Sequence, residues 1–134
     1  MTDACSPARI FAACRTIAVV GLSPKPHRDS FRVARYLQAQ GFRIVPINPN
    51  ARDVLGEPAY ATLTEAARHT PIDLVDCFRN SEDIPPIVDE AIAIGAKAVW
   101  LQIGIVHEAA AAKARAAGLC VVQDRCTMVE HARL

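Results

Sequence analysis

One segment near the start of the chain gathers residue types that bind anions. It begins at Gly21 and carries hydroxyl and cationic side chains in close succession: Ser23, Lys25, Arg28 and Ser30. An apolar β-branched run precedes it and an amphipathic pattern follows it, which predicts a loop leading from a strand into a helix. Cations, hydroxyls and a helix N-terminus together bind phosphate. A solvated basic loop stiffened by two prolines is the alternative that the spacing leaves open.

Two features separate this segment from a dinucleotide-binding site. The GxGxxG fingerprint needs its second and third glycines because the backbone must approach a pyrophosphate closely, and here only Gly21 is present. An acid near the end of the second strand normally binds the ribose hydroxyls, but this strand ends at Ile47, Asn48 and Pro49. The sequence therefore disfavours a nicotinamide cofactor and leaves an NAD-type redox protein as an alternative.

Three further segments with polar or aromatic residues follow expected strands: Asn48 with Pro49, Phe78 with Arg79, and Gln102 with Ile103 and Gly104. The carboxyl ends of parallel strands lie at one edge of a sheet, where ligands bind, so we expect these segments to meet there. Phe78 and Arg79 are suited to sandwich a base or pair with a phosphate; an exposed aromatic residue beside a surface cation is the alternative. Gly104 allows a close ligand approach or simply turns the backbone.

The cysteines and histidines give little sign of catalysis or metal binding. Five cysteines without a CxxC pair argue against a disulfide framework and against zinc. Cys77 and Cys120 fall within expected strands, which predicts buried, inert thiols. Cys126 follows a strand beside Arg125 and is a candidate reactive thiol if it is partly exposed, although the sequence favours a buried, inert thiol here as well. The histidines lack metal-ligand spacing, and no Ser or Cys has an evident His partner, so we predict no metal site and no catalytic residue.

The elements that must position these residues alternate along the chain. Strands are expected at 17–21, 43–47, 73–78, 98–102 and 119–122. Helices are expected at 7–14, 29–40, 64–69, from Ser81 or Asp83 to Gly95, 107–117 and 127–132, while 51–63 looks irregular. Short connections between strand and helix favour parallel pairing with right-handed crossovers. The pattern predicts an α/β fold: a single Rossmann-like domain with an open parallel five-stranded sheet and helices on both faces.

Composition excludes several classes of protein. The 134 residues are 51% hydrophobic and 22% charged, which fits one folded domain and excludes a disordered chain. The net charge of +1 gives no support for nucleic-acid or anionic-membrane partners. The most apolar stretch, 91–106, is interrupted by Gly95, Lys97 and Gln102 and does not read as a membrane span. We expect a cytoplasmic protein with a helical extension over 1–15 and one domain over 16–134.

Several short motifs together point to one family. They are Val20-Gly21-Leu22-Ser23-Pro24-Lys25-Pro26 with Arg28 and Ser30, Pro46-Ile47-Asn48-Pro49, Cys77-Phe78-Arg79, Trp100-Leu101-Gln102-Ile103-Gly104-Ile105 and Asp124-Arg125-Cys126. From about Thr16 to Leu134 the chain resembles the small CoA-binding domain proteins, stand-alone relatives of the nucleotide-binding first domain of the succinyl-CoA synthetase alpha subunit. The histidine-bearing second domain of that synthetase has no counterpart here, so we expect no ligase activity.

The resemblance implies a site for coenzyme A or an acyl-CoA at the same edge of the sheet. It assigns pyrophosphate and ribose phosphate to Gly21, Ser23, Lys25, Arg28 and Ser30. It places Asn48 and Pro49 at the adenosine end, Phe78, Arg79 and Ile84 beside the nucleotide, and Gln102, Ile103 and Gly104 along the pantetheine arm toward Cys126.

The leading hypothesis is therefore a non-catalytic module that binds CoA or an acyl-CoA. Three alternatives stand beside it. In the first alternative, Cys126 forms a mixed disulfide with the CoA thiol. In the second, the chain is an NAD-linked oxidoreductase. In the third, it is a partner or regulatory subunit of an acyl-CoA enzyme.

Overall fold

Five short runs of β-branched and small apolar residues pair in parallel to form the central sheet of the computed structural model, which describes residues 4–134. The strands are β1 (Thr16–Val20), β2 (Arg43–Ile47), β5 (Leu74–Cys77), β6 (Ala98–Leu101) and β7 (Cys120–Val122). Their order is β2-β1-β5-β6-β7, and each neighbouring pair is parallel. The predicted α/β, Rossmann-like fold is confirmed, with boundaries shifted by a residue or two.

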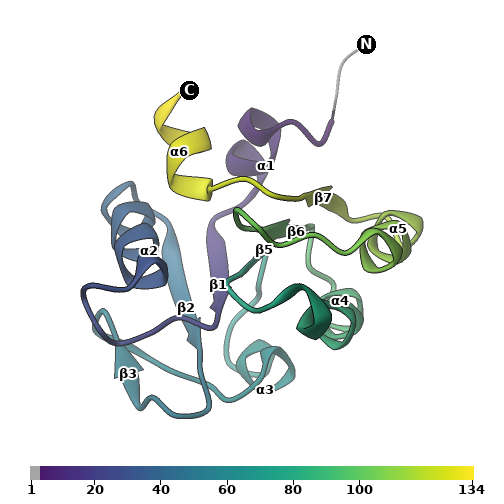
Figure 1. Ribbon diagram of the computed structural model, residues 1–134. Coiled ribbons are helices and arrows are strands. Elements are labelled where there is room, and N and C mark those ends of the chain that lie inside the picture. Colours follow the sequence, from purple (N-terminus) through teal and green to yellow (C-terminus); the bar gives the residue numbers. More distant parts are fainter. Residues whose placement is uncertain (1–3) are drawn as a thin grey trace.

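Helices cover both faces of this sheet (Figure 1). They are α1 (Pro7–Ala13), α2 (Asp29–Ala39), α3 (Leu63–Ala67), α4 (Ile84–Ala93), α5 (Glu108–Ala116) and α6 (Thr127–Ala132), with a 3-10 turn, η1 (Ser81–Asp83), before α4. One buried cluster joins the sheet to α3, α4 and α5, and a second joins its other face to α1, α2 and α6. Both faces are thus apolar, as parallel strands require.

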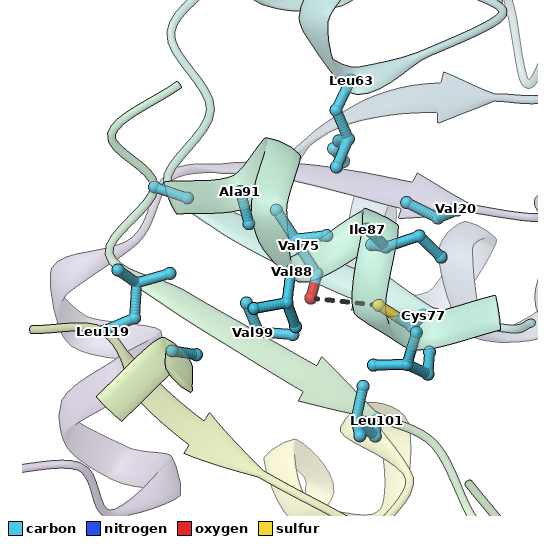
Figure 2. Close-up of a cluster of buried hydrophobic side chains, with 14 of the residues drawn as sticks. Val20, Leu63, Val75, Cys77, Ile87, Val88, Ala91, Val99, Leu101 and Leu119 are labelled. Atoms are coloured by element: carbon cyan, nitrogen blue, oxygen red, sulfur yellow. Dashed lines mark hydrogen bonds between the residues drawn. The ribbon is translucent and has the colours of Figure 1, made fainter. Parts of the chain in front are cut away.

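The first cluster shows how the strands alternate their side chains. Val75 and Cys77 of β5, together with Val99 and Leu101 of β6, point toward α4, where Val88 is 1% exposed (Figure 2). The Cys77 thiol reaches the Val75 carbonyl at 4.0 Å. The thiol is fully buried, and this burial, with the nearby Asp76 carboxyl as a smaller cause, raises its pKa well above the ordinary value. Cys77 is the inert core cysteine that the sequence predicted.

The second cluster ties the N-terminal and C-terminal helices to the sheet. Phe11 of α1 contacts the rings of Trp100 and His131 at centroid distances of 5.4 and 5.1 Å. His131 Nδ1 lies 2.9 Å from the hydroxyl of Tyr36 in α2. Trp100 donates its indole N–H to the carbonyl of Arg125 at 2.8 Å. Helices α1, α2 and α6 are therefore held together on one face, as Figure 1 shows for α1 and α6 near the two termini.

Two expectations from the sequence are wrong. Residues 51–63 were expected to be irregular, but Asp53–Val54 (β3) and Glu57–Pro58 (β4) form a small antiparallel ribbon. Strands this short carry no periodic pattern from which to predict them. Cys120 was expected to be a buried free thiol, yet it forms a disulfide with Cys5, 115 residues away in sequence. The pairing arises because the segment before α1 lies beside the edge strand β7, which residue spacing cannot indicate.

Among residues 4–134, no helix combines the length and apolar character needed to cross a membrane.

Candidate functional site

The strand order creates a switch point between β1 and β5. From β1 the chain moves outward to β2, and it later returns to the other side of β1 as β5. In an open parallel sheet the crevice beyond the strand ends at such a point is where ligands bind. Gly21 follows β1 and Phe78 follows β5, and the Phe78 N–H bonds to the carbonyl of Val20 at 2.9 Å. The residues after these strands therefore lie side by side.

Gly21 is required by the backbone at this point. Its φ is +86°, which L side chains rarely adopt. A Cβ built on Gly21 would lie 3.1 Å from the Phe78 carbonyl oxygen and 3.1 Å from Cδ of Arg79. The glycine thus lets β1 turn sharply while the chain after β5 packs against it.

One cleft at this edge lies beside Gly21, between β1, β2, α3 and α4, and is called here the β1–β2 cleft. Its two parts, of about 270 and 350 Å³, share Gly21, Pro49, Arg79 and Asp83 as lining residues. One part is largely apolar and extends toward Leu63 and Ile87, which the sequence analysis did not identify. The other is polar and includes Asn48, Asn50, Phe78 and Asn80.

The second cleft, called here the α2–α6 cleft, lies on the other side of Phe78. Its volume is about 260 Å³, and its lining comprises Asp29, Arg32, Val33, Phe78, Gln102, Ile103, Ile105, Cys126 and Met128. Phe78 lines this cleft and the polar part of the β1–β2 cleft as well, so the two are neighbours across one side chain. A ligand with a polar and a less polar end fits such a pair of clefts.

The loop between β1 and α2 is shaped by its own hydroxyl groups. Ser23 donates its N–H to Ser30 Oγ at 3.0 Å, and Ser23 Oγ accepts the N–H of Lys25 at 3.1 Å. Lys25 and Arg28 are exposed, and neither forms an ion pair with any residue in 4–134. The described lining of the two clefts does not include four of the predicted site residues, namely Ser23, Lys25, Arg28 and Ser30.

Three other predicted site residues have structural roles in this conformation. Asn48 donates Nδ2–H to the Leu22 carbonyl at 3.0 Å, and its Oδ1 accepts the N–H of Asn50 at 2.8 Å, which fixes the turn after β2. Ile84 is fully buried at the start of α4 and packs in the first core cluster, and its place beside the nucleotide stays a prediction. Gly104 does not line the described clefts; its N–H bonds to Asp124 Oδ1 at 2.7 Å.

Charged side chains at the cleft rims are paired with one another. Arg79 lies 3.6 Å from Asp83 Oδ2, and both side chains are partly exposed. Arg32 forms an ion pair with Asp29 at the start of α2. Exposed pairs of this kind contribute about 0–1 kcal/mol each, so a ligand phosphate can replace either carboxylate at little cost.

A buried polar group below the α2–α6 cleft escaped the sequence analysis. Asp76 of β5 and Thr127 of α6 are fully buried, and Gln102 after β6 is 5% exposed. Burial raises the pKa of Asp76 from 3.8 to about 8, with a smaller opposing effect from the Thr127 hydroxyl. A carboxyl in the middle of the apolar run 73–78 was the signal for this group, because ionisable residues are rarely buried in parallel strands.

The fold and these clefts define a single Rossmann-like α/β domain with a candidate ligand site at its switch point. The family model described as CoA binding domain matches residues 15–132. The chain therefore belongs to the CoA-binding domain family, as its motifs predicted.

The chain is also similar to individual known proteins. The chain is 38% identical over 123 residues to the uncharacterized Bacillus subtilis protein YneT. This alignment covers 92% of this chain and 90% of YneT. It is similar to the solved structure of a hypothetical protein from Pyrococcus horikoshii, with a TM-score of 0.91, 38% identity, and coverage of 96% of this chain and 89% of that one. It also shares its fold with part of a dinucleotide-forming acetyl-coenzyme A synthetase from Ca. Korarchaeum cryptofilum. That likeness has a TM-score of 0.70 and 22% identity over 80% of this chain, but only 25% of the synthetase chain.

Proposed function

We propose that the protein binds coenzyme A or an acyl-CoA along the carboxyl edge of its sheet without transforming it. The nucleotide end lies over Gly21, the β1–α2 loop and the β1–β2 cleft, and the pantetheine arm passes Phe78 into the α2–α6 cleft. The observation that carries this proposal is that one side chain, Phe78, borders both clefts in a chain of the CoA-binding domain family.

The anionic end of CoA has suitable partners around the β1–α2 loop. Arg28 occupies the N-cap position of α2 and makes no side-chain hydrogen bond to the helix, so the first-turn N–H groups remain available to a ligand. Lys25 and Arg28 are exposed and are not paired with any carboxylate in residues 4–134. A helix N-terminus with two unpaired cations favours phosphate binding.

Calorimetric titration with CoA, dephospho-CoA and NAD tests the proposal. We expect CoA to bind more tightly than NAD, because the site lacks both the glycine fingerprint and the ribose-binding acid. Replacing both cations, Lys25→Gln with Arg28→Gln, removes contacts worth about 1 kcal/mol each at an exposed site, which predicts about 30-fold weaker CoA binding.

The matched control replaces two exposed arginines at the opposite edge of the sheet, Arg43→Gln with Arg115→Gln. Arg43 begins β2, and Arg115 lies in the last turn of α5. This control changes the net charge equally and should leave CoA affinity within about twofold, since exposed charges far from the ligand are screened by salt. Equal CoA affinity in the wild type and the Lys25/Arg28 variant, or equal binding of CoA and NAD, would contradict the proposal.

A second candidate function is thiol exchange at Cys126, favoured by the position of this residue at the wall of the α2–α6 cleft. In this reaction the Cys126 thiolate attacks the disulfide of oxidised CoA, a Cys126–CoA mixed disulfide forms, and one CoA thiolate leaves. All three free cysteines are buried, and Cys126, at 9% exposure, is the one that lines this cleft. Burial raises the pKa of Cys14 to about 11 and that of Cys77 well above its ordinary value. Low thiolate content makes them poor nucleophiles.

Intact-mass analysis after incubation with CoA disulfide tests this function. We expect one added CoA moiety in the wild type and none in Cys126→Ser, with Cys14→Ser as the control that retains the adduct. An unmodified wild-type mass would rule out exchange at Cys126 while leaving non-covalent CoA binding untouched.

A further inference from the structure

The buried polar group below the α2–α6 cleft links three elements of the fold. Thr127 Oγ1, at the start of α6, lies 3.0 Å from Asp76 Oδ2 on β5 and 3.0 Å from Gln102 Oε1 after β6. The Thr127 backbone N–H also donates to Gln102 Oε1, at 3.2 Å. These contacts are buried, whereas Gln102 also lines the cleft. The side chain of Gln102 therefore connects a buried network to the candidate site.

The number of available protons fixes the direction of the hydrogen bonds. A threonine hydroxyl has one proton, so it can donate to Asp76 or to Gln102 but not to both. With a protonated Asp76, the carboxyl donates to Thr127 Oγ1 and Thr127 donates to Gln102 Oε1, which satisfies both 3.0 Å contacts. An ionised Asp76 would accept the hydrogen bond from the Thr127 hydroxyl. Thr127 Oγ1 and Gln102 Oε1 would then face each other with no proton between them. Complete burial of Asp76, which raises its pKa to about 8, favours the protonated state as well.

The same network fixes which end of the Gln102 carboxamide faces the cleft. Its oxygen must face Thr127, because the backbone N–H and the hydroxyl of Thr127 both donate there. The Nε2 group then lies on the other side of the carboxamide. It has no hydrogen-bond partner among residues 4–134, and it is not sealed from solvent, unlike Asp76 Oδ1. Gln102 thus presents an N–H donor to the cleft.

The surroundings of this donor indicate which ligand group it recognises. The cleft wall near it is largely apolar, with Val33, Phe78, Ile105 and Met128, and its one cation, Arg32, is paired with Asp29. A neutral amide donor within this largely apolar wall suits a neutral acceptor, whereas phosphates are bound mainly by charged donors. The pantetheine arm carries amide carbonyls, and an acyl-CoA adds a thioester carbonyl.

We propose that Asp76, acting through Thr127, positions Gln102 so that its side-chain N–H donates to a carbonyl oxygen of the pantetheine arm or thioester. Asp76 and Thr127 are positioning residues, and Gln102 is the residue that contacts the ligand. This inference rests on the proposed CoA site and adds a chemical requirement to it, namely a carbonyl group opposite Gln102.

Calorimetric titration of Gln102→Met against the wild type tests the contact. We expect CoA affinity to fall about five- to tenfold, the effect of one net hydrogen bond, and the affinity for adenosine 3′,5′-bisphosphate, which lacks the arm, to stay unchanged. A comparable loss with CoA and acetyl-CoA identifies a pantetheine amide as the acceptor, whereas a loss confined to acetyl-CoA identifies the thioester.

Two conservative pairs of variants test the positioning role. Thr127→Val removes the hydroxyl link and should weaken CoA about threefold, while Thr127→Ser keeps the link and should bind as the wild type does. Asp76→Asn also retains a donor toward Thr127 and should bind CoA within about twofold of the wild type. A loss in Asp76→Asn as large as that in Gln102→Met would overturn the positioning role.

The wild-type protein provides a readout that does not depend on variant folding. The Gln102 side-chain amide resonances in ¹⁵N-labelled protein should shift on addition of CoA and not on addition of adenosine 3′,5′-bisphosphate. Unchanged resonances with saturating CoA and with saturating acetyl-CoA, or equal losses of CoA and bisphosphate affinity in Gln102→Met, would overturn the inference while CoA binding itself stands. Wild-type protein that binds neither ligand would instead overturn the proposed function.

Discussion

Asp76→Asn should change how the stability of the protein depends on pH. Asp76 is fully buried in β5, which lies between β1 and β6 in the sheet, and its Oδ1 has no hydrogen-bond partner among residues 4–134. Burial raises the pKa of its carboxyl from 3.8 to about 8. In the unfolded chain the same group releases its proton near pH 4. Between these values the native state binds one proton that the unfolded state does not.

The sign and size of the effect follow from this difference in bound protons. The stabilisation is complete below the unfolded pKa, decreases as pH rises, and levels off once the native group ionises near pH 8. One proton corresponds to about 1.4 kcal/mol per pH unit, so the wild type should lose about 3 kcal/mol between pH 5 and 7 from this residue. Asparagine does not titrate, so Asp76→Asn lacks this loss.

Urea unfolding at pH 5, 6 and 7, followed by the fluorescence of the single, fully buried Trp100, measures both proteins. All other titratable groups are common to the two proteins, so the difference in unfolding free energy isolates Asp76. We expect that difference to move by about 3 kcal/mol in favour of Asp76→Asn from pH 5 to 7. A difference that stays constant over this range would show that Asp76 is ionised in the native protein and would refute the proton assignment above.

Two further predictions concern the switch point and the N-terminal segment. Gly21→Ala places a Cβ at a residue with positive φ and close to Phe78 and Arg79. It should lower the unfolding free energy by about 1–3 kcal/mol, measured by urea unfolding, and weaken CoA binding, measured by calorimetry. Reducing the Cys5–Cys120 disulfide removes a cross-link between residues 115 apart, which should cost up to about 5 kcal/mol. Cys120→Ser without reductant should match the reduced wild type; an unchanged urea midpoint in both would contradict this.

The sequence was sufficient to predict the five strands of the parallel sheet but not all of the chemistry at their ends. Strands such as β1 are predictable because a short run of mostly β-branched residues closed by Gly21 has few other interpretations. The meeting of Gly21, Phe78 and Arg79 also follows, since parallel strands end at one edge. The burial of Ile84 also follows from the helical spacing that it shares with Ile87 and Val88 in α4.

Contacts between distant segments were beyond the sequence for a different reason. The network of Asp76, Gln102 and Thr127 joins residues separated by 25 and 51 positions. Asp76 stands out in the sequence as a carboxyl within a strand, but no local pattern pairs it with the other two residues. The strand order brings β5 beside β6 and sets α6 across their ends, and no local pattern encodes that order. The same holds for the disulfide.

Stability and ligand recognition make opposite demands on Asp76, and this separates two explanations of the residue. If its task is to donate a proton to Thr127, asparagine performs that task without the cost of ionisation, so Asp76→Asn should be more stable at pH 7 and should still bind CoA. If the site needs the charge or proton release of the carboxyl, the same variant should be more stable but should bind CoA poorly. Measuring unfolding and CoA affinity on this one variant therefore distinguishes a fixed donor from a titrating group below the α2–α6 cleft.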